Sequence, residues 1–120
     1  MTINSPMMGM RSATTSVDYS PIVVPSWRDV AEDSEFIRKI LAWKWPAQIP
    51  YHLVFSYQPG ESGDGVVALG SQIPIGLQQE AARVYGFQAT HAGILGDPVF
   101  LAHFESVISL ASHTVATSAR

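Results

Sequence analysis

The fold of this chain is decided by one stretch, Tyr51-His52-Leu53-Val54-Phe55-Ser56-Tyr57, which is rich in aromatic and β-branched residues. The stretch begins directly after Pro50 and stops before Pro59-Gly60, and such residues bound a strand on either side. We therefore expect the strongest strand of the molecule here. Farther along, Arg83-Val84-Tyr85-Gly86-Phe87 predicts another strand, and Met1-Thr2-Ile3-Asn4 predicts a brief one that runs into a loop.

Helices are expected before and after the central strand in the sequence. A short amphipathic helix begins after Asp33 or Ser34, either of which can serve as its N-cap, and a brief helical segment covers residues 74–82. Asp97-Pro98 supplies an N-cap and a first-turn proline for a terminal helix over residues 97–115. The apolar stripe of the first helix comprises Phe36, Ile37, Ile40 and Leu41, and that of the terminal helix comprises Phe100, Phe104, Val107, Ile108 and Ala111.

Residues 11–33 have a different character. They are rich in Ser, Thr, Pro and Asp and keep no sustained period of 2 or 3.6 residues. We interpret them as an excursion from the core, and residues 11–49 together as a cap-like or lid-like segment. The alternation of strands and helices then predicts a single α/β domain over residues 1–120, with a small sheet of three to four strands and flanking helices.

Composition excludes several classes of protein. Of the 120 residues, 47% are hydrophobic and 14% are charged, which is enough apolar material for a folded core. The seven Lys and Arg residues are scattered and the net charge is -3, so we expect no nucleic-acid partner. The lack of cysteine excludes disulfides and thiolate ligands. We see no leader-like segment and no apolar run of about 18 residues, and therefore expect a cytoplasmic protein without a membrane span.

Two residues that could carry chemistry follow the ends of predicted strands. Asp64 lies in Gly63-Asp64-Gly65-Val66-Val67, and His91 lies in Thr90-His91-Ala92-Gly93-Ile94-Leu95. Because the carboxyl ends of parallel strands meet at one edge of a sheet, we expect the two side chains to approach each other. A buried carboxylate that accepts the Nδ1 proton of an imidazole prepares Nε2 to take a proton from a nucleophile. The alternative readings are a turn aspartate and an ordinary loop histidine.

In their order and context these segments resemble the acid and histidine segments of lipase-like and esterase-like α/β-hydrolases. The resemblance extends to Ile3-Asn4-Ser5-Pro6-Met7-Met8-Gly9, which is similar to the segment after a late core strand, and to Pro25-Ser26-Trp27-Arg28-Asp29-Val30, which looks like part of a cap. It covers nearly the whole chain but only the final third or so of a typical member. The resemblance implies a carboxylester hydrolase with Asp64 and His91 as catalytic residues, no cofactor, and a small apolar ester as substrate.

One departure from the family concerns the nucleophile. The sequence contains no Gly-x-Ser-x-Gly elbow, and Gly60-Glu61-Ser62-Gly63-Asp64 comes closest to it. Three serines lie near the expected crevice and are candidate surrogates, with turn and capping roles as the alternative: Ser5, Ser62 and Ser71. A second hypothesis is a non-catalytic fragment, or the complementing half of a split hydrolase that acts through association. An unpaired sheet edge leads us to expect a homo-oligomer or a complementing chain under either hypothesis.

The remaining histidines and the tryptophans receive structural interpretations. His52 is expected inside a strand, and His103 and His113 lie ten positions apart without a third ligand, so no metal site is expected. The tryptophans of the cap-like segment could cover an apolar acyl pocket or could simply pack: Trp27, Trp43 and Trp45.

Overall fold

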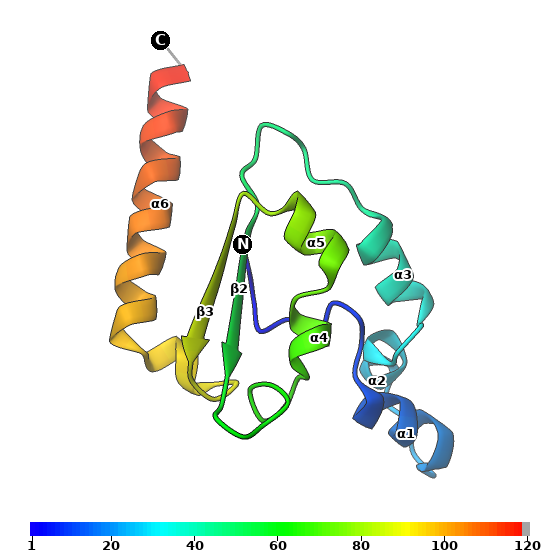
Figure 1. Ribbon diagram of the computed structural model, residues 1–120. Helices are drawn as coiled ribbons and strands as arrows, with labels where there is room; N and C mark the ends of the chain where they lie inside the picture. Colours follow the sequence, from blue (N-terminus) through cyan, green and yellow to red (C-terminus); the bar gives the residue numbers. More distant parts are fainter. Residues whose placement is uncertain (119–120) are drawn as a thin grey trace.

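The centre of the molecule is a sheet of three parallel strands in the order β1-β2-β3 (Figure 1). The computed structural model describes residues 1–118, with side chains as far as residue 110. The strands are β1 (Thr2–Ile3), β2 (His52–Tyr57) and β3 (Arg83–Gln88). All three coincide with the expected strands to within a residue or two. The three strands and flanking helices confirm the α/β class predicted from the sequence.

Helices flank the sheet on both faces. In Figure 1, α6 stands on one side of the strands, α3, α4 and α5 lie on the other, and α1 and α2 lie farther out. Each connection between consecutive strands contains helix, as parallel strands require. The helices are α1 (Arg11–Tyr19), α2 (Pro25–Val30), α3 (Glu35–Ala42), α4 (Leu69–Gln72), α5 (Ile75–Glu80), the 3₁₀ helix η1 (Gly93–Gly96) and α6 (Pro98–Ser118). Among these described helices, none is both long enough and apolar enough to cross a membrane.

The central strand supplies both halves of the core because successive side chains point to opposite faces of a sheet. Leu53 packs with Met7, Tyr51 and Leu77 on the face that α3 and α5 cover. Val54 packs on the other face, where its neighbours come from η1 and α6: Ile94, Phe100 and Phe104. The sheet is therefore buried on both faces along β2.

The expected helix after residue 33 is present as α3. Its N-cap is Ser34, whose Oγ accepts a hydrogen bond from the Ile37 backbone N–H at 3.1 Å. One member of the predicted apolar stripe is wrong, because Phe36 is 48% exposed whereas Ile37 is buried. Phe36 lies in the first turn of the helix, directly after Glu35, and is not among the residues that pack against the core, as Ile40 and Leu41 do.

The terminal helix also begins as expected. Asp97 Oδ1 accepts hydrogen bonds from the Val99 and Phe100 backbone N–H groups, which caps α6. Phe100 is buried and Phe104 and Val107 are half-buried, but Ile108 is 49% exposed, so among the described side chains the predicted stripe is wrong at Ile108. Ala111, the last member of that stripe, lies outside the residues whose side chains are described.

The excursion between β1 and α3 contains regular structure that its composition did not predict. Helix α1 is made largely of Ser, Thr and Val, which are indifferent helix formers. Hydrogen bonds of Thr14 offset this weak helix propensity, because its Oγ1 donates to Met10 O and accepts from the Glu32 backbone N–H. This bond ties α1 to the segment after α2. None of residues 11–33 belongs to either core cluster, although Ala13 and Ala31 are buried.

The tryptophans of the cap-like segment have different surroundings. Trp45 stacks on Tyr51 with ring centroids 4.5 Å apart and packs against the core. Trp43 is 60% exposed, and Trp27 is more than one third exposed. Of the three, Trp45 alone packs against a core cluster of the described residues.

Candidate active site

Asp64 is held in a tight turn just beyond the end of β2. This turn, which we call the acid turn, is closed by an isolated backbone bridge between Gly63 and Ala68. One carboxylate oxygen, Oδ1, accepts hydrogen bonds from the backbone N–H groups of Val66 at 2.9 Å and Val67 at 2.7 Å. The residue is 1% exposed. This carboxylate therefore has one oxygen committed to its own turn and one oxygen left for another partner.

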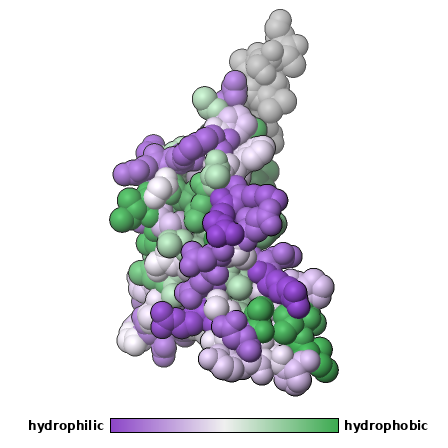
Figure 2. Space-filling model, turned by 90° about the vertical axis from the view of Figure 1, so that its right-hand side faces the viewer, coloured by the Kyte–Doolittle hydropathy of each residue, from purple (hydrophilic) through white to green (hydrophobic). Residues whose placement is uncertain are grey.

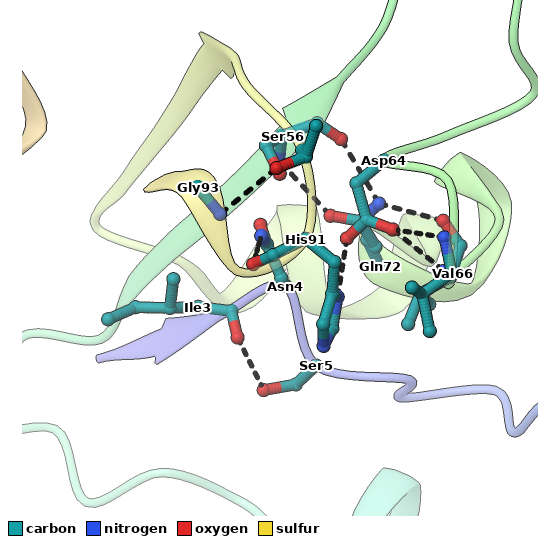
Figure 3. Close-up of polar contacts among 11 residues, drawn as sticks. Ile3, Asn4, Ser5, Ser56, Asp64, Val66, Gln72, His91 and Gly93 are labelled. Carbon is teal, nitrogen blue, oxygen red and sulfur yellow. Dashed lines mark hydrogen bonds and ion pairs between the residues drawn. The ribbon is translucent and has the colours of Figure 1, made fainter. Parts of the chain in front are cut away.

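The free oxygen of Asp64 is bound by His91, which follows β3 (Figure 3). Nδ1 of His91 lies 2.8 Å from Oδ2 of Asp64. The backbones of the two residues are joined as well, because the His91 N–H donates to the Asp64 carbonyl oxygen at 3.0 Å. The pair that the strand ends predicted is thus brought together by two independent contacts. Thr90 Oγ1 accepts from the Gly93 N–H and fixes the start of η1 beyond His91.

Electrostatics favour the ionised form of Asp64. Burial acts to raise its pKa, but hydrogen bonds from the Val67 N–H, from His91 and from the Val66 N–H outweigh burial, and the pKa is lowered from its ordinary value. An ionised carboxylate can only accept hydrogen bonds, so the proton in the contact belongs to Nδ1 of His91. The neutral imidazole is then held with Nε2 as its unprotonated, basic nitrogen.

The far side of the His91 ring is open. Its side chain is 38% exposed, whereas that of Asp64 is fully buried. Nε2 has no hydrogen-bond partner among the described residues. In Figure 3 the imidazole extends from Asp64 toward the segment that carries Ser5. A reacting group can reach Nε2 from solvent while Nδ1 remains anchored.

Asn4 joins the end of β1 to the histidine loop. Its Nδ2 donates to the carbonyl oxygen of His91 at 3.0 Å, and its backbone N–H donates to Val54 O. Asn4 is 3% exposed and has φ of 48°, the left-handed region that Asn tolerates better than most residues. All three strands therefore contribute to the site, β1 through Asn4, β2 through Asp64 and β3 through His91.

The three candidate serines are engaged elsewhere or are unattached to His91. Ser5 Oγ donates to Ile3 O at 3.2 Å. Ser71 Oγ donates to Gly9 O at 2.7 Å and accepts from the Met8 N–H, so it ties the loop after β1 to α4. Ser62 is exposed and lines an open groove of about 840 Å³ between the acid turn and the start of α1. Neither Asp64 nor His91 is among the residues that line this groove.

The other described histidines lie away from this site. His52 begins β2 at the end opposite Asp64, and its ring stacks on Tyr85. His103 lies on α6 with its ring centroid 3.8 Å from that of the same tyrosine. The side chain of His113 lies outside the described residues. Within the described part of the chain, no three His, Asp or Glu residues gather as metal ligands would.

Sequence reasoning missed two residues that hold the pair in place. Asn4 carried a weak signal, since an Asn at a strand end is typical of a turn. Gln72 carried no signal in the sequence, because a polar residue at the end of a four-residue helix is expected to lie on the surface. It is nevertheless 1% exposed, with hydrogen bonds to the backbone of β2 and of the acid turn.

Comparison with known proteins gave no match: no family model, no curated protein sequence and no solved structure is significantly similar to the chain.

Proposed function

We propose that the chain acts in acyl transfer as a carboxylester hydrolase of the esterase or lipase type, with His91 as general base and Asp64 as the residue that orients it. One observation carries this proposal: a buried, ionised carboxylate bonds Nδ1 of an imidazole whose Nε2 is open to solvent. This is the arrangement that makes an imidazole a directed base in serine hydrolases. A purely structural ion pair has no need to leave Nε2 accessible.

In the proposed reaction a serine hydroxyl gives its proton to Nε2 of His91 as its oxygen attacks the ester carbonyl carbon. The imidazolium that forms is stabilised by Asp64 and returns the proton to the departing alkoxide, which leaves as the alcohol. Water then attacks the acyl-enzyme through the same base and releases the carboxylic acid and the free serine. Lipases and esterases, which the sequence resembles, suggest a small apolar ester as substrate.

The nucleophile is proposed to be a serine of this chain or of a chain that pairs with it. Ser5 has the best position among the three candidates because Asn4, its neighbour, already contacts the His91 backbone. Its hydroxyl needs only a side-chain rotation away from Ile3 O to become free. The Asn4 contact places the segment that follows β1 beside the loop that carries His91.

Hydrolysis of short p-nitrophenyl esters tests the proposal. We expect His91→Ala to remove nearly all turnover, whereas His52→Gln, which removes an imidazole at the opposite end of β2, should leave turnover close to that of the wild type. Ser5→Ala, Ser62→Ala and Ser71→Ala then identify a nucleophile within the chain, and a serine-directed phosphonate should label the same residue. Equal rates for His91→Ala and His52→Gln, or turnover that survives every serine change and the phosphonate, would overturn the proposal.

A second candidate function is complementation of another hydrolase chain. The observation that favours it is the edge of the sheet at β1, whose backbone pairing within the described residues is with β2 alone. A strand added at this edge would run next to Asn4 and His91, where a nucleophile is needed. An inactive chain that gains His91-dependent esterase activity on mixing with a nucleophile-bearing hydrolase fragment would support this candidate over the first.

A further inference from the structure

The end of β2 lies next to a space that no strand fills. The Val54 carbonyl oxygen accepts from Asn4 on the β1 side, so the backbone groups of Ser56, two residues on, face the same side. Strand β1 has already ended there, at Ile3. Buried backbone N–H and C=O groups need partners, and a side chain must supply them where no strand does.

Gln72 supplies those partners. Its Oε1 accepts from the Ser56 N–H at 3.1 Å, and its Nε2 donates to the Ser56 carbonyl oxygen at 3.1 Å. The side-chain amide thus pairs with one residue of β2 as another strand would. The second proton of Nε2 goes to the Val67 carbonyl oxygen at 3.0 Å, so both amide protons are used.

Val67 is the residue through which this contact reaches the site. Its N–H makes the shorter of the two backbone hydrogen bonds to Asp64 Oδ1, at 2.7 Å, and Asp64 Oδ2 holds His91. A continuous series of hydrogen bonds therefore runs from β2 through Gln72 and the acid turn to the imidazole (Figure 3). Each side chain of the series except His91 is almost fully buried.

We infer that Gln72 is a positioning residue of the acid–base pair: it locks the acid turn onto β2 so that Asp64 fixes the proton of His91 on Nδ1. This inference rests on the proposed function of the pair. A carboxylate at position 72 could accept from Ser56 but could donate to neither carbonyl oxygen. Gln72→Glu should therefore release the turn at Val67 with almost no change in side-chain size.

The test is the tautomeric state of His91 in ¹⁵N-labelled protein, read from long-range ¹H–¹⁵N spectra and assigned by comparison with His91→Ala. The wild type should show Nδ1 protonated and Nε2 unprotonated. Gln72→Glu should give a mixture of tautomers, with the Nδ1–H signal weaker than in the wild type. If this variant fails to fold, Gln72→Met removes the same donors without adding a charge. Ester turnover should fall about 100-fold, the size expected when a positioned group moves by about 1 Å.

Two controls separate positioning from stability. Gln78→Glu makes the same change on α5, where the amide is exposed and donates to Ile73 O. Leu77→Ala destabilises the core on the α5 face without touching the acid turn. Both should keep the Nδ1–H tautomer of His91.

A wild-type tautomer retained in both Gln72 variants would overturn the inference and leave the proposed function standing. Mixed tautomers in the wild type itself would overturn both, because there would be no oriented pair to hold. An oriented His91 without His91-dependent turnover would overturn the proposed function alone.

Discussion

The carboxylate of Asp64 serves two purposes with its two oxygens. Oδ1 closes a turn through Val66 and Val67, while Oδ2 binds His91. The sequence left open whether this residue is a turn aspartate or the partner of a histidine, and at this position both descriptions are correct. The turn is what keeps the second oxygen pointed at the imidazole.

The lowered pKa of Asp64 predicts how stability depends on pH. A carboxyl group whose pKa is lower in the folded than in the unfolded state stabilises the fold above its unfolded pKa of about 3.9, and this contribution is lost as pH falls through the folded pKa. Asp64→Asn should cost about 2 kcal/mol of unfolding free energy at pH 7, because the hydrogen bonds at this position are then no longer made to a charged group. Urea unfolding should show the difference from the wild type shrinking below pH 4, and a difference that stays constant down to pH 2 would contradict this account.

Two glycines, one in the acid turn and one in the loop before it, should differ in how well they tolerate a side chain. A Cβ on Gly63 would lie 2.1 Å from the Val67 carbonyl oxygen, a contact that the backbone must move to relieve. Gly63→Ala should therefore cost about 3 kcal/mol and abolish turnover. Gly60 has φ of 80° but open space around it, so Gly60→Ala should cost only about 1 kcal/mol and leave turnover intact. Denaturant unfolding of the two variants checks the order, and equal costs would be inconsistent with the turn as described.

Helix α6 meets the sheet through an aromatic cluster that should respond to acid. The ring of Tyr85 contacts both His52 and His103. The pKa of His52 is lowered, first by burial and then by the α-amino group of Met1, by His103 and by Arg83. Folding therefore favours the neutral ring. The contribution of the neutral His52 ring to the free energy of unfolding is present above the unfolded pKa of about 6.5 and is lost as pH falls through the folded pKa.

Unfolding free energy should accordingly fall as pH drops below about 6.5, and part of this slope should disappear in His52→Gln. Thermal unfolding of the two proteins between pH 5 and pH 8 makes the comparison. The prediction fails if the two stability curves run parallel over that range.

The sequence predicted the helices and strands better than it predicted the contacts between segments that lie far apart in the chain. Strand β2 was recognisable because its residues and flanking prolines are local signals, and Ser34 and Asp97 marked helix starts for the same reason. The Asp64–His91 contact was predicted because the carboxyl ends of parallel strands meet at one edge of a sheet. Helix α1 could not be predicted, because a long-range bond from Thr14 to Glu32 supports it. The role of Gln72 could not be predicted either, since it depends on where β1 stops.

At the scale of the whole molecule, the chain is more open than a compact protein of its size. It exposes 8053 Å², against about 6300 Å² expected for a compact monomer of 13.0 kDa. Its radius of gyration is 16.2 Å, against about 14 Å for a compact domain of this length. Figure 2 shows apolar surface interspersed with polar surface, including at the lower end of the molecule, where Figure 1 places α1 and α2. Tyr19 and Ile22 near these helices are mostly exposed.

This open surface, together with the edge at β1, predicts that the protein associates in solution. The excess area is comparable to the total area, about 1600 Å², that a standard protein–protein interface buries. Sedimentation velocity at about 0.1 mM should show a species heavier than 13.0 kDa. Ile22→Asp serves as a matched variant: association that survives it points to the edge at β1, whereas its loss assigns the contact to the exposed loop after α1. A single species of monomer mass would contradict the prediction.

The central claim is that Asp64 makes His91 a directed base, and the most direct test keeps the imidazole and changes only its partner. The quantity to measure is kcat/KM for p-nitrophenyl butyrate at pH 7 in the wild type and in Asp64→Asn. A simple exposed imidazole would be indifferent to this change, whereas an oriented base loses its tautomer. The account predicts a wild-type value about 10³ to 10⁴ times that of the variant, as in serine hydrolases whose triad Asp is replaced by Asn. A ratio close to one would contradict it.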